Sequence, residues 1–150
     1  MAKPGHHQPV PDGRALALDL GDQRIGVAVC DSARLVATPL ETLQRSGDRL
    51  IDHGRITELC DEHDIAVIVV GLPFTLTGEL GPAAKSILRE VKALRRRTGR
   101  STVTHDERLT TVIAQDSLHA QGKNTRQGRA MIDQLAATVI LQSWIEMNSR

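Results

Sequence analysis

The chain has very few aromatic side chains: its 150 residues include one Phe, one Trp and no Tyr. Proteins that bind nucleic acids mainly by base stacking present several exposed aromatic rings, so this composition excludes base stacking as the main binding mode. Any nucleic-acid partner would have to be held through its sugar-phosphate backbone. The sequence also lacks a motif that reads the 2′-hydroxyl, and it therefore does not distinguish RNA from DNA.

The chain also lacks an excess of charge of either sign, because 19 Lys and Arg stand against 18 Asp and Glu. An electrostatic partner must therefore be inferred from local charge. Cys30 and Cys60 are far apart and lack the spacing of metal ligands, and the six histidines show no zinc pattern. The sequence shows no signal peptide and no apolar run of membrane length, so we expect a reduced, cytoplasmic protein with no membrane partner.

Length and periodicity favour one α/β domain. Hydrophobic residues make up 40% of the chain, enough for a substantial core. Residues 1–13 lack periodicity, which predicts a disordered N-terminal tail before a single domain over 14–150. Strands are predicted over 14–20, 24–30, 34–40, 66–71 and 101–105, and helices over about 48–63, 82–98, 110–120 and 128–147. This order favours a mixed five-stranded sheet, an antiparallel meander followed by parallel strands, with helices on its faces.

Three acidic residues stand in unusual settings. Asp19 interrupts an apolar strand just before a Gly turn, and Glu107 falls where a short β-branched strand gives way to a helix. Asp133 lies on a predicted helix whose apolar stripe continues three, four and seven residues later, so its side chain is expected to face inward. Carboxylates kept in apolar surroundings usually serve metal or phosphate chemistry. If the three meet, they suit the divalent cations Mg²⁺ or Mn²⁺ and metal-dependent hydrolysis of a phosphodiester.

Each acid also has a purely structural explanation. Asp19 fits a turn acid that pairs with a backbone amide or with Arg24. Asp106 and Glu107 fit acids that stabilise a helix N-terminus, an effect of about 0.3–1 kcal/mol, and this applies to Asp106 even if Glu107 is catalytic. Asp133 fits a first-turn acid if its helix begins later than predicted.

Five segments, in order and spacing, resemble the YqgF/RuvX family. They are residues 19–29, 70–73, 78–82, 106–111 and 133–137. The resemblance covers roughly residues 14–147. Members of that family are described as Holliday junction resolvases and as nucleases that mature the 5′ end of pre-16S rRNA, on an RNase H-like fold.

The resemblance implies a catalytic and metal-binding triad of Asp19, Glu107 and Asp133, the same residues that the apolar settings select. With the oxygen ligands of this triad, we expect Mg²⁺ or Mn²⁺ as the cofactor. The loop after residue 73 departs from a common family pattern at Thr75, Thr77 and Leu80. We therefore expect no metal role for that loop.

Local clusters of basic residues fit a polyanionic partner. Lys and Arg bind phosphates with little sequence preference, through contacts that salt weakens. The alternative for the run of arginines at 95–97 is a solvated helix end, where positive charge is favourable in any helix. The residues predicted to contact nucleic acid are Arg24, Arg95, Arg96, Arg108, Lys123, Arg126 and Arg129.

The expected substrate is structured nucleic acid, with the 5′ end of pre-16S rRNA first and branched DNA second. Two other classes stay open. The Asp-Leu-Gly hairpin resembles the phosphate-binding hairpin of sugar kinases, Hsp70-like chaperones and actin, but those proteins bind nucleotide between two such domains and 150 residues supply one. A non-catalytic RNA-binding factor for ribosome assembly would tolerate loss of the acids, and all three are present. The sequence leaves the oligomeric state, a homodimer included, and the position of the cut open.

Overall fold

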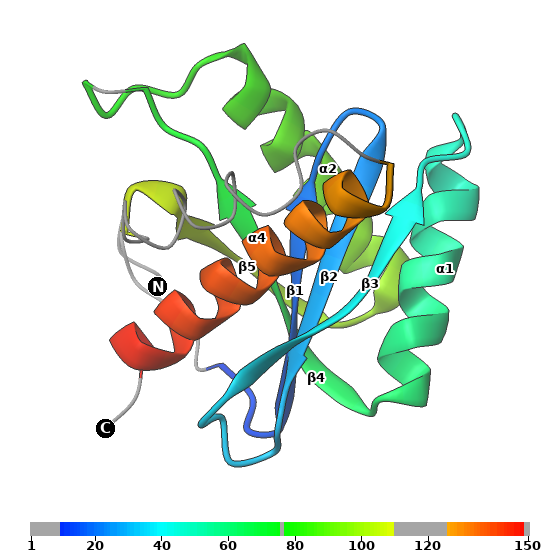
Figure 1. Ribbon diagram of the computed structural model, residues 1–150, viewed down its shortest axis with the longest axis vertical. Helices are drawn as coiled ribbons and strands as arrows, with labels where there is room; N and C mark the ends of the chain where they lie inside the picture. Colours follow the sequence, from blue (N-terminus) through cyan, green and yellow to red (C-terminus); the bar gives the residue numbers. More distant parts are fainter. Residues whose placement is uncertain (1–9, 76, 110–125, 149–150) are drawn as a thin grey trace, which may run out of the picture.

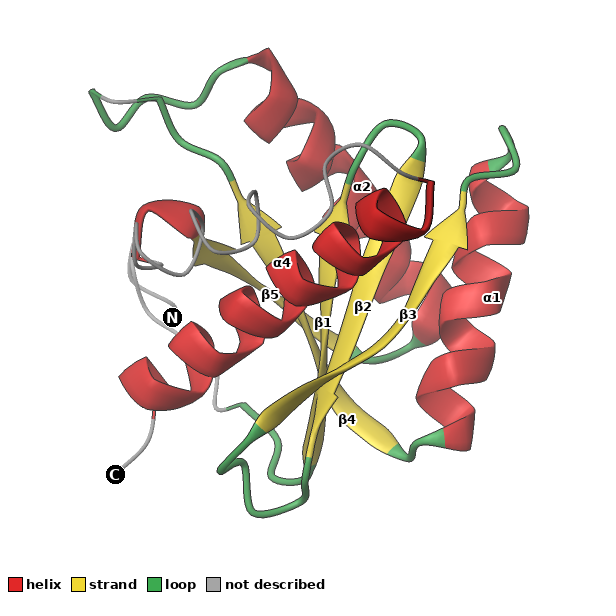
Figure 2. Cartoon of the chain, viewed as in Figure 1, coloured by secondary structure: helices red, strands yellow, loops and turns green. Residues whose placement is uncertain are grey.

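The computed structural model describes residues 10–75, 77–109 and 126–148, which form one mixed sheet with helices on both faces (Figures 1 and 2). The sheet order is β3-β2-β1-β4-β5. β1 and β3 run antiparallel to β2, whereas β4 runs parallel to both β1 and β5. The elements are β1 (Arg14–Leu20), β2 (Arg24–Cys30), β3 (Ala37–Gln44), α1 (Arg49–Glu62), β4 (Ile65–Leu72), α2 (Pro82–Thr98), β5 (Ser101–Asp106), η1 (Glu107–Leu109) and α4 (Arg126–Asn148).

The predicted fold class is confirmed, and one strand differs. β3 covers Ala37–Gln44, not 34–40, so Pro39 lies near the start of the strand and not near its end. Proline is tolerated there because β3 is an edge strand and its register with β2 shifts near this point. The predicted helix over 110–120 lies outside the described residues, and the single domain over 14–150 stays a prediction.

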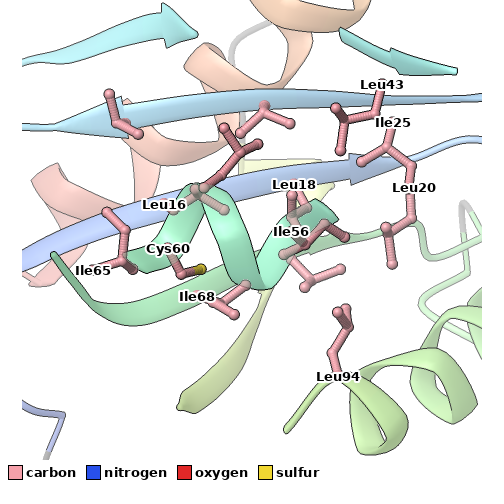
Figure 3. Packing of buried hydrophobic residues seen from close by; sticks show 14 of the residues in the cluster. Leu16, Leu18, Leu20, Ile25, Leu43, Ile56, Cys60, Ile65, Ile68 and Leu94 are labelled. Atoms are coloured by element: carbon pink, nitrogen blue, oxygen red, sulfur yellow. The ribbon is translucent and has the colours of Figure 1, made fainter. Parts of the chain in front are cut away.

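Alternation along the strands divides the core between the two faces of the sheet. In β1, Leu16, Leu18 and Leu20 pack with the residues of α1 and α2, as Figure 3 shows for this cluster. Ala15 and Ala17 face the other way and pack with α4. Because successive side chains of a strand point to opposite faces, the next odd residue, Asp19, falls on the α4 face.

α4 crosses the front of the sheet in Figure 1, and its backbone comes close to the sheet at one glycine. The face beneath it carries small residues, including Ala15, Ala17 and Ala28. At Gly26 of β2 the approach is closest, because a Cβ built on this glycine would lie 1.9 Å from the carbonyl oxygen of Asp133.

None of the helices in the described part of the chain is long and apolar enough to cross a membrane, and this includes α4 with its 23 residues.

A buried ionic network on the opposite face fixes the turn that follows Asp19. The Glu90 side chain, 2% exposed, accepts two hydrogen bonds of 2.9 Å from the Arg45 guanidinium and lies 2.8 Å from His53 Nε2. Burial raises the pKa of Glu90, but its bonds to His53 and Arg45 outweigh burial and hold the pKa at about 2. Arg45 also donates to the carbonyl of Gly21 at 2.7 Å, which ties the β1–β2 turn to α2.

Residues 10–13, which the sequence assigned to the tail, contact the body of the protein. Arg34 donates hydrogen bonds to the carbonyls of Gly13 and Pro11. Val10 packs against the apolar cluster under α4. Residues 1–9 lie outside the described part of the chain.

The close approach of α4 gives a first prediction. Gly26→Ala should lower the free energy of unfolding by about 3 kcal/mol or more, because the new methyl group can be accommodated only if a helix backbone moves away from the sheet. Gly54→Ala is the matched control, since nothing lies within 4 Å of the added methyl group on α1 and alanine favours a helix by roughly 0.5–1 kcal/mol. Urea denaturation of both variants measures this, and equal stabilities would contradict the close contact.

Candidate active site

Asp19 stands near the carboxyl end of the central strand β1 and points to the α4 face. Its cross-strand partner in β2 is Gly26, the residue on which α4 rests. The missing side chain at Gly26 therefore lets the helix that carries Asp133 approach the strand that carries Asp19. Two of the three predicted acids are brought together by this single contact.

Glu107 reaches the same face from the other side. It is the first residue of η1, directly after β5. Its Oε1 lies 3.0 Å from the position a Cβ would take on Gly71, in β4, which pairs directly with β1. The same hypothetical Cβ would meet the Ile140 side chain of α4, so Glu107 lies on the face that α4 covers. A side chain at position 71 would displace this carboxylate.

Asp133 lies about two turns inside α4, which begins at Arg126. The alternative of a first-turn acid is therefore wrong for this residue. Its carboxylate Oδ2 accepts a 2.6 Å hydrogen bond from Arg24 Nε, and the two side chains are 19% and 30% exposed. The alternative in which Arg24 pairs with Asp19 is wrong as well, because α4 places Asp133 over the start of β2.

Burial and mutual repulsion raise the pKa of two of these carboxyl groups. Desolvation, followed by repulsion from Glu107 and then Asp133, raises the pKa of Asp19 to about 7. Desolvation first and the charge of Asp106 second raise the pKa of Glu107. Perturbed carboxyl groups that gather at one edge of a sheet are typical of sites that handle protons, cations or phosphate.

The three acids share one face and one edge of the sheet, but their carboxylates are not in contact as a cluster. Within the described ranges, no group of three or more His, Cys, Asp and Glu side chains is arranged to hold a metal ion. The ion pair of Asp133 with Arg24 directs one of the three carboxylates to a guanidinium. The metal-binding role of the triad therefore stays a prediction.

Asp106 and Arg108 form a pair beside Glu107. The Asp106 carboxylate accepts hydrogen bonds from the Arg108 backbone amide at 2.9 Å and from its guanidinium at 2.7–3.1 Å. The side-chain bonds of Arg108, outweighing the desolvation that opposes them, lower the pKa of Asp106. Asp106 therefore caps the start of η1 from the residue before it, in agreement with its structural explanation as an acid at a helix N-terminus. Arg108 also lies 4.7 Å from the Phe74 ring centroid, and so joins the loop after β4 to the site.

The His105 side chain makes its hydrogen bond with α4. Its Nε2 lies 2.8 Å from the hydroxyl of Ser143 on α4, and burial lowers its pKa. The hydroxyl group is its hydrogen-bond partner, so we assign His105 no proton-transfer role.

The structure places the predicted basic residues in different settings. Arg24 and Arg129 lie at the edge of the sheet that carries the acids. Arg95 donates a hydrogen bond to the Thr102 carbonyl at 2.8 Å. It lies in the last turn of α2, at the end of that helix that is far from the carboxyl end of β4. Arg96 is exposed on the same last turn. Lys123 and the side chain of Arg126 lie outside the described part of the chain.

Sequence reasoning missed the two glycines that build the site. Gly26 and Gly71 are in strand interiors, where glycine weakens a strand and marks a close approach of backbone or ligand. Both lie on the α4 face, beneath Asp133 and Glu107 respectively. A glycine inside a predicted strand was therefore the sequence signal that could have identified both positions.

Comparison with known proteins shows the family to which this chain is similar. The model of the RuvX family, described as Holliday junction resolvase, matches residues 13–147. A relative from Rhodococcus opacus (strain B4), named "Putative pre-16S rRNA nuclease", is 43% identical over 152 aligned residues, covering 99% of this chain and 85% of that protein. A protein of the same name from Desulforudis audaxviator (strain MP104C) is 42% identical, covering 91% of this chain and 95% of its own length.

The fold comparison points to a related architecture. RuvC from T. thermophilus, in complex with a Holliday junction substrate, superimposes with a TM-score of 0.58 at 16% sequence identity. The match covers 91% of this chain and 97% of that one. The RNase H-like fold that the sequence predicted is confirmed by this likeness.

The raised pKa of Asp19 gives a second prediction. Because the folded protein holds the Asp19 proton more tightly than the unfolded chain, stability falls as the pH rises from about 4 to about 7. Asp19→Asn removes this cost, so the variant should exceed the wild type in unfolding free energy at pH 8 by on the order of 2–4 kcal/mol, with the difference vanishing near pH 4.

Chemical denaturation across this pH range, without divalent cations, measures the effect. Asp64→Asn is the control, because it removes an exposed carboxylate from a turn with a φ of 54°, a conformation that asparagine also accepts. A difference between wild type and Asp19→Asn that does not change with pH would contradict the raised pKa.

Proposed function

Because the chain belongs to the RuvX family, we propose that it is a metal-dependent nuclease that hydrolyses phosphodiester bonds in structured nucleic acid, with the 5′ end of pre-16S rRNA as its substrate. The observation that carries this proposal is the gathering of Asp19, Glu107 and Asp133 on one face of the sheet, with the pKa of Asp19 at about 7. We infer that the reaction takes place in the cytoplasm, where ribosome precursors mature.

The relatives favour rRNA over branched DNA. The proteins named for pre-16S rRNA are 42–46% identical to this chain, whereas RuvC shares 16% identity with it. At the lower identity a common fold is expected to carry different substrates. Branched DNA is therefore the second candidate, supported by the description of the family itself.

The carboxylate side chains at this edge of the sheet are chemically suited to bind a divalent cation. Asp19 and Glu107 are partly buried carboxyl groups whose charged forms are disfavoured by burial and by neighbouring negative charge. A phosphodiester brings a further negative charge to the same edge, so a site of this kind needs positive charge to bind its substrate. Carboxylate oxygens are the ligands that Mg²⁺ and Mn²⁺ accept. We assign Asp19, Glu107 and Asp133 as the residues that would hold the cation.

The cation, when bound, supplies Lewis-acid stabilisation of the charge that develops on the phosphodiester. The protein's own residues set the frame for that chemistry. Gly26 and Gly71 let α4 and Glu107 approach β1, and Arg24 holds Asp133 through its Nε. The pair of Asp106 with Arg108 fixes the turn that carries Glu107. Asp106 serves this positioning role, and we assign it no contact with the substrate.

Cleavage assays on two substrates test the proposal. Wild type and the variants Asp19→Asn, Glu107→Gln and Asp133→Asn are incubated with a labelled pre-16S rRNA fragment and with a four-way DNA junction, each with Mg²⁺, with Mn²⁺ or with EDTA. Each variant should lose activity by about 100-fold or more, because each removes a charge that acts in the transition state. EDTA should abolish cleavage by the wild type.

The control variant is Asp64→Asn, which removes one carboxylate at a turn outside the site and should cleave as the wild type does. Cleavage that persists in EDTA or in Asp19→Asn would refute the metal-dependent mechanism. Faster cleavage of the junction than of the rRNA fragment would make branched DNA the substrate. Binding of the rRNA fragment without cleavage under every metal condition would favour the non-catalytic assembly factor.

A further inference from the structure

A small polar pocket lies beside Asp133, at the edge of the sheet where the acids gather. It has a volume of about 270 Å³. Three elements build it: the start of β2, the end of β3 and residues 129–130 near the start of α4, which lie next to one another in Figure 1. Its lining contains two arginines and no acidic residue, and consists of Gln23, Arg24, Thr42, Gln44, Arg129 and Ala130.

Arg24 enters this pocket with most of its hydrogen-bonding capacity available. Its bond to Asp133 uses Nε, and within the described residues its terminal amino groups make no hydrogen bond. A guanidinium has five N–H donors, so four remain on these groups. The bond to Asp133 also fixes the orientation of the guanidinium plane, which lowers the entropy that a bound anion must overcome.

Arg129 supplies the second positive charge. It lies on α4 one turn before Asp133, is exposed, and makes no ion pair with any acidic residue of the described chain. Thr42 donates from its hydroxyl to the Ala130 carbonyl at 2.6 Å, which ties β3 to α4 and holds the two walls at a fixed separation. The amide side chains of Gln23 and Gln44 complete the lining with neutral donors and acceptors.

This chemistry selects a singly charged phosphate ester. Two guanidinium groups with neutral amides bind phosphate oxygens well, since arginine matches phosphate geometry with paired N–H groups. The pocket is just below the roughly 300 Å³ of small-molecule sites, which suits one phosphate with part of its sugar. The lining includes no aromatic side chain on which a base could stack.

We propose that this pocket is a subsite for a backbone phosphate of the nucleic-acid strand, next to the phosphodiester that is hydrolysed. The identity of the strand rests on the proposed nuclease function, whereas the affinity for phosphate does not. The hydrogen bond from Arg24 to Asp133 joins the pocket to the edge that carries the acids, so a phosphate bound by Arg24 and Arg129 sets the position of the strand along that edge. The subsite thereby lowers KM and orients the strand for the cut.

Two binding measurements in EDTA test the subsite without any contribution from catalysis. Inorganic phosphate is titrated into the ¹⁵N-labelled protein, and the side-chain amides of Gln23 and Gln44 should shift in the NMR spectrum. The affinity for a labelled single-stranded oligonucleotide is measured by fluorescence anisotropy over a range of salt concentrations. Arg129→Gln should weaken this affinity about tenfold and reduce the magnitude of the salt slope by about one.

Arg55→Gln is the matched control, because Arg55 is an exposed arginine of α1 whose ion pairs are with surface glutamates. It should change the affinity less than twofold. Among the described residues, Arg129 has no hydrogen-bond or ion-pair partner that its loss would disturb, so a folded variant is expected. An unchanged affinity for Arg129→Gln, an equal loss in Arg55→Gln, or phosphate shifts that spare both glutamines would overturn the subsite.

The outcomes separate this proposal from the nuclease function. A protein that binds phosphate at these glutamines but cleaves neither rRNA nor DNA keeps the subsite and refutes the nuclease. A protein that cleaves with a KM unaffected by Arg129→Gln refutes the subsite and keeps the nuclease.

Discussion

The contact between α4 and Gly26 of β2 is the constraint on which the rest of the site depends. A helix normally rests on a sheet through side chains, which keep its backbone several ångströms further away. Here the carbonyl of Asp133 occupies the space where a Cβ would lie. Because Asp19 pairs with Gly26 across the strands, this contact decides that the acid of the central strand and the acid of the helix occupy one face.

A second glycine, in β4 on the other side of β1, also makes room for the site. Gly71 leaves space for the Glu107 carboxylate and for the Ile140 side chain of α4. The site therefore depends on two positions without a side chain, Gly26 in β2 and Gly71 in β4. They make room around Asp19, in the strand between them, and around Glu107, which follows β5. Small side chains further along β1 and β2 continue the pattern, and let the apolar stripe of α4 pack closely on the sheet.

The arginines around the site neutralise some of its acidic side chains and leave the repulsion at Asp19 in place. Arg24 neutralises Asp133, and Arg108 neutralises Asp106. Asp19 has a pKa near 7 because burial and its two acidic neighbours act together. The remaining imbalance is the physical reason to expect a cation at the acids and an anionic strand along the adjacent arginines. The proposed phosphate subsite and the edge that carries the three acids are two parts of one electrostatic arrangement.

The sequence by itself determined the class of fold and singled out the three acids as candidates. Alternating strands and helical stripes identified five strands in the right order, because side-chain periodicity is a local property of the chain. Asp19 stood out because a carboxylate within an apolar strand is costly wherever that strand lies. Asp133 stood out because it interrupts an apolar helical stripe. Local rules failed at Pro39, which an edge strand tolerates and which periodicity alone treats as an end.

Only the tertiary structure decided which charges meet. Arg24 is five residues from Asp19 and 109 from Asp133, yet it bonds to Asp133, because α4 returns across the face of β2. The same return brings Arg129 beside Gln23 and Gln44 and so forms the pocket that we propose as a phosphate subsite. Partners of this kind are fixed by the path of the chain through space, and no spacing along the sequence records how closely a glycine lets a helix approach a sheet.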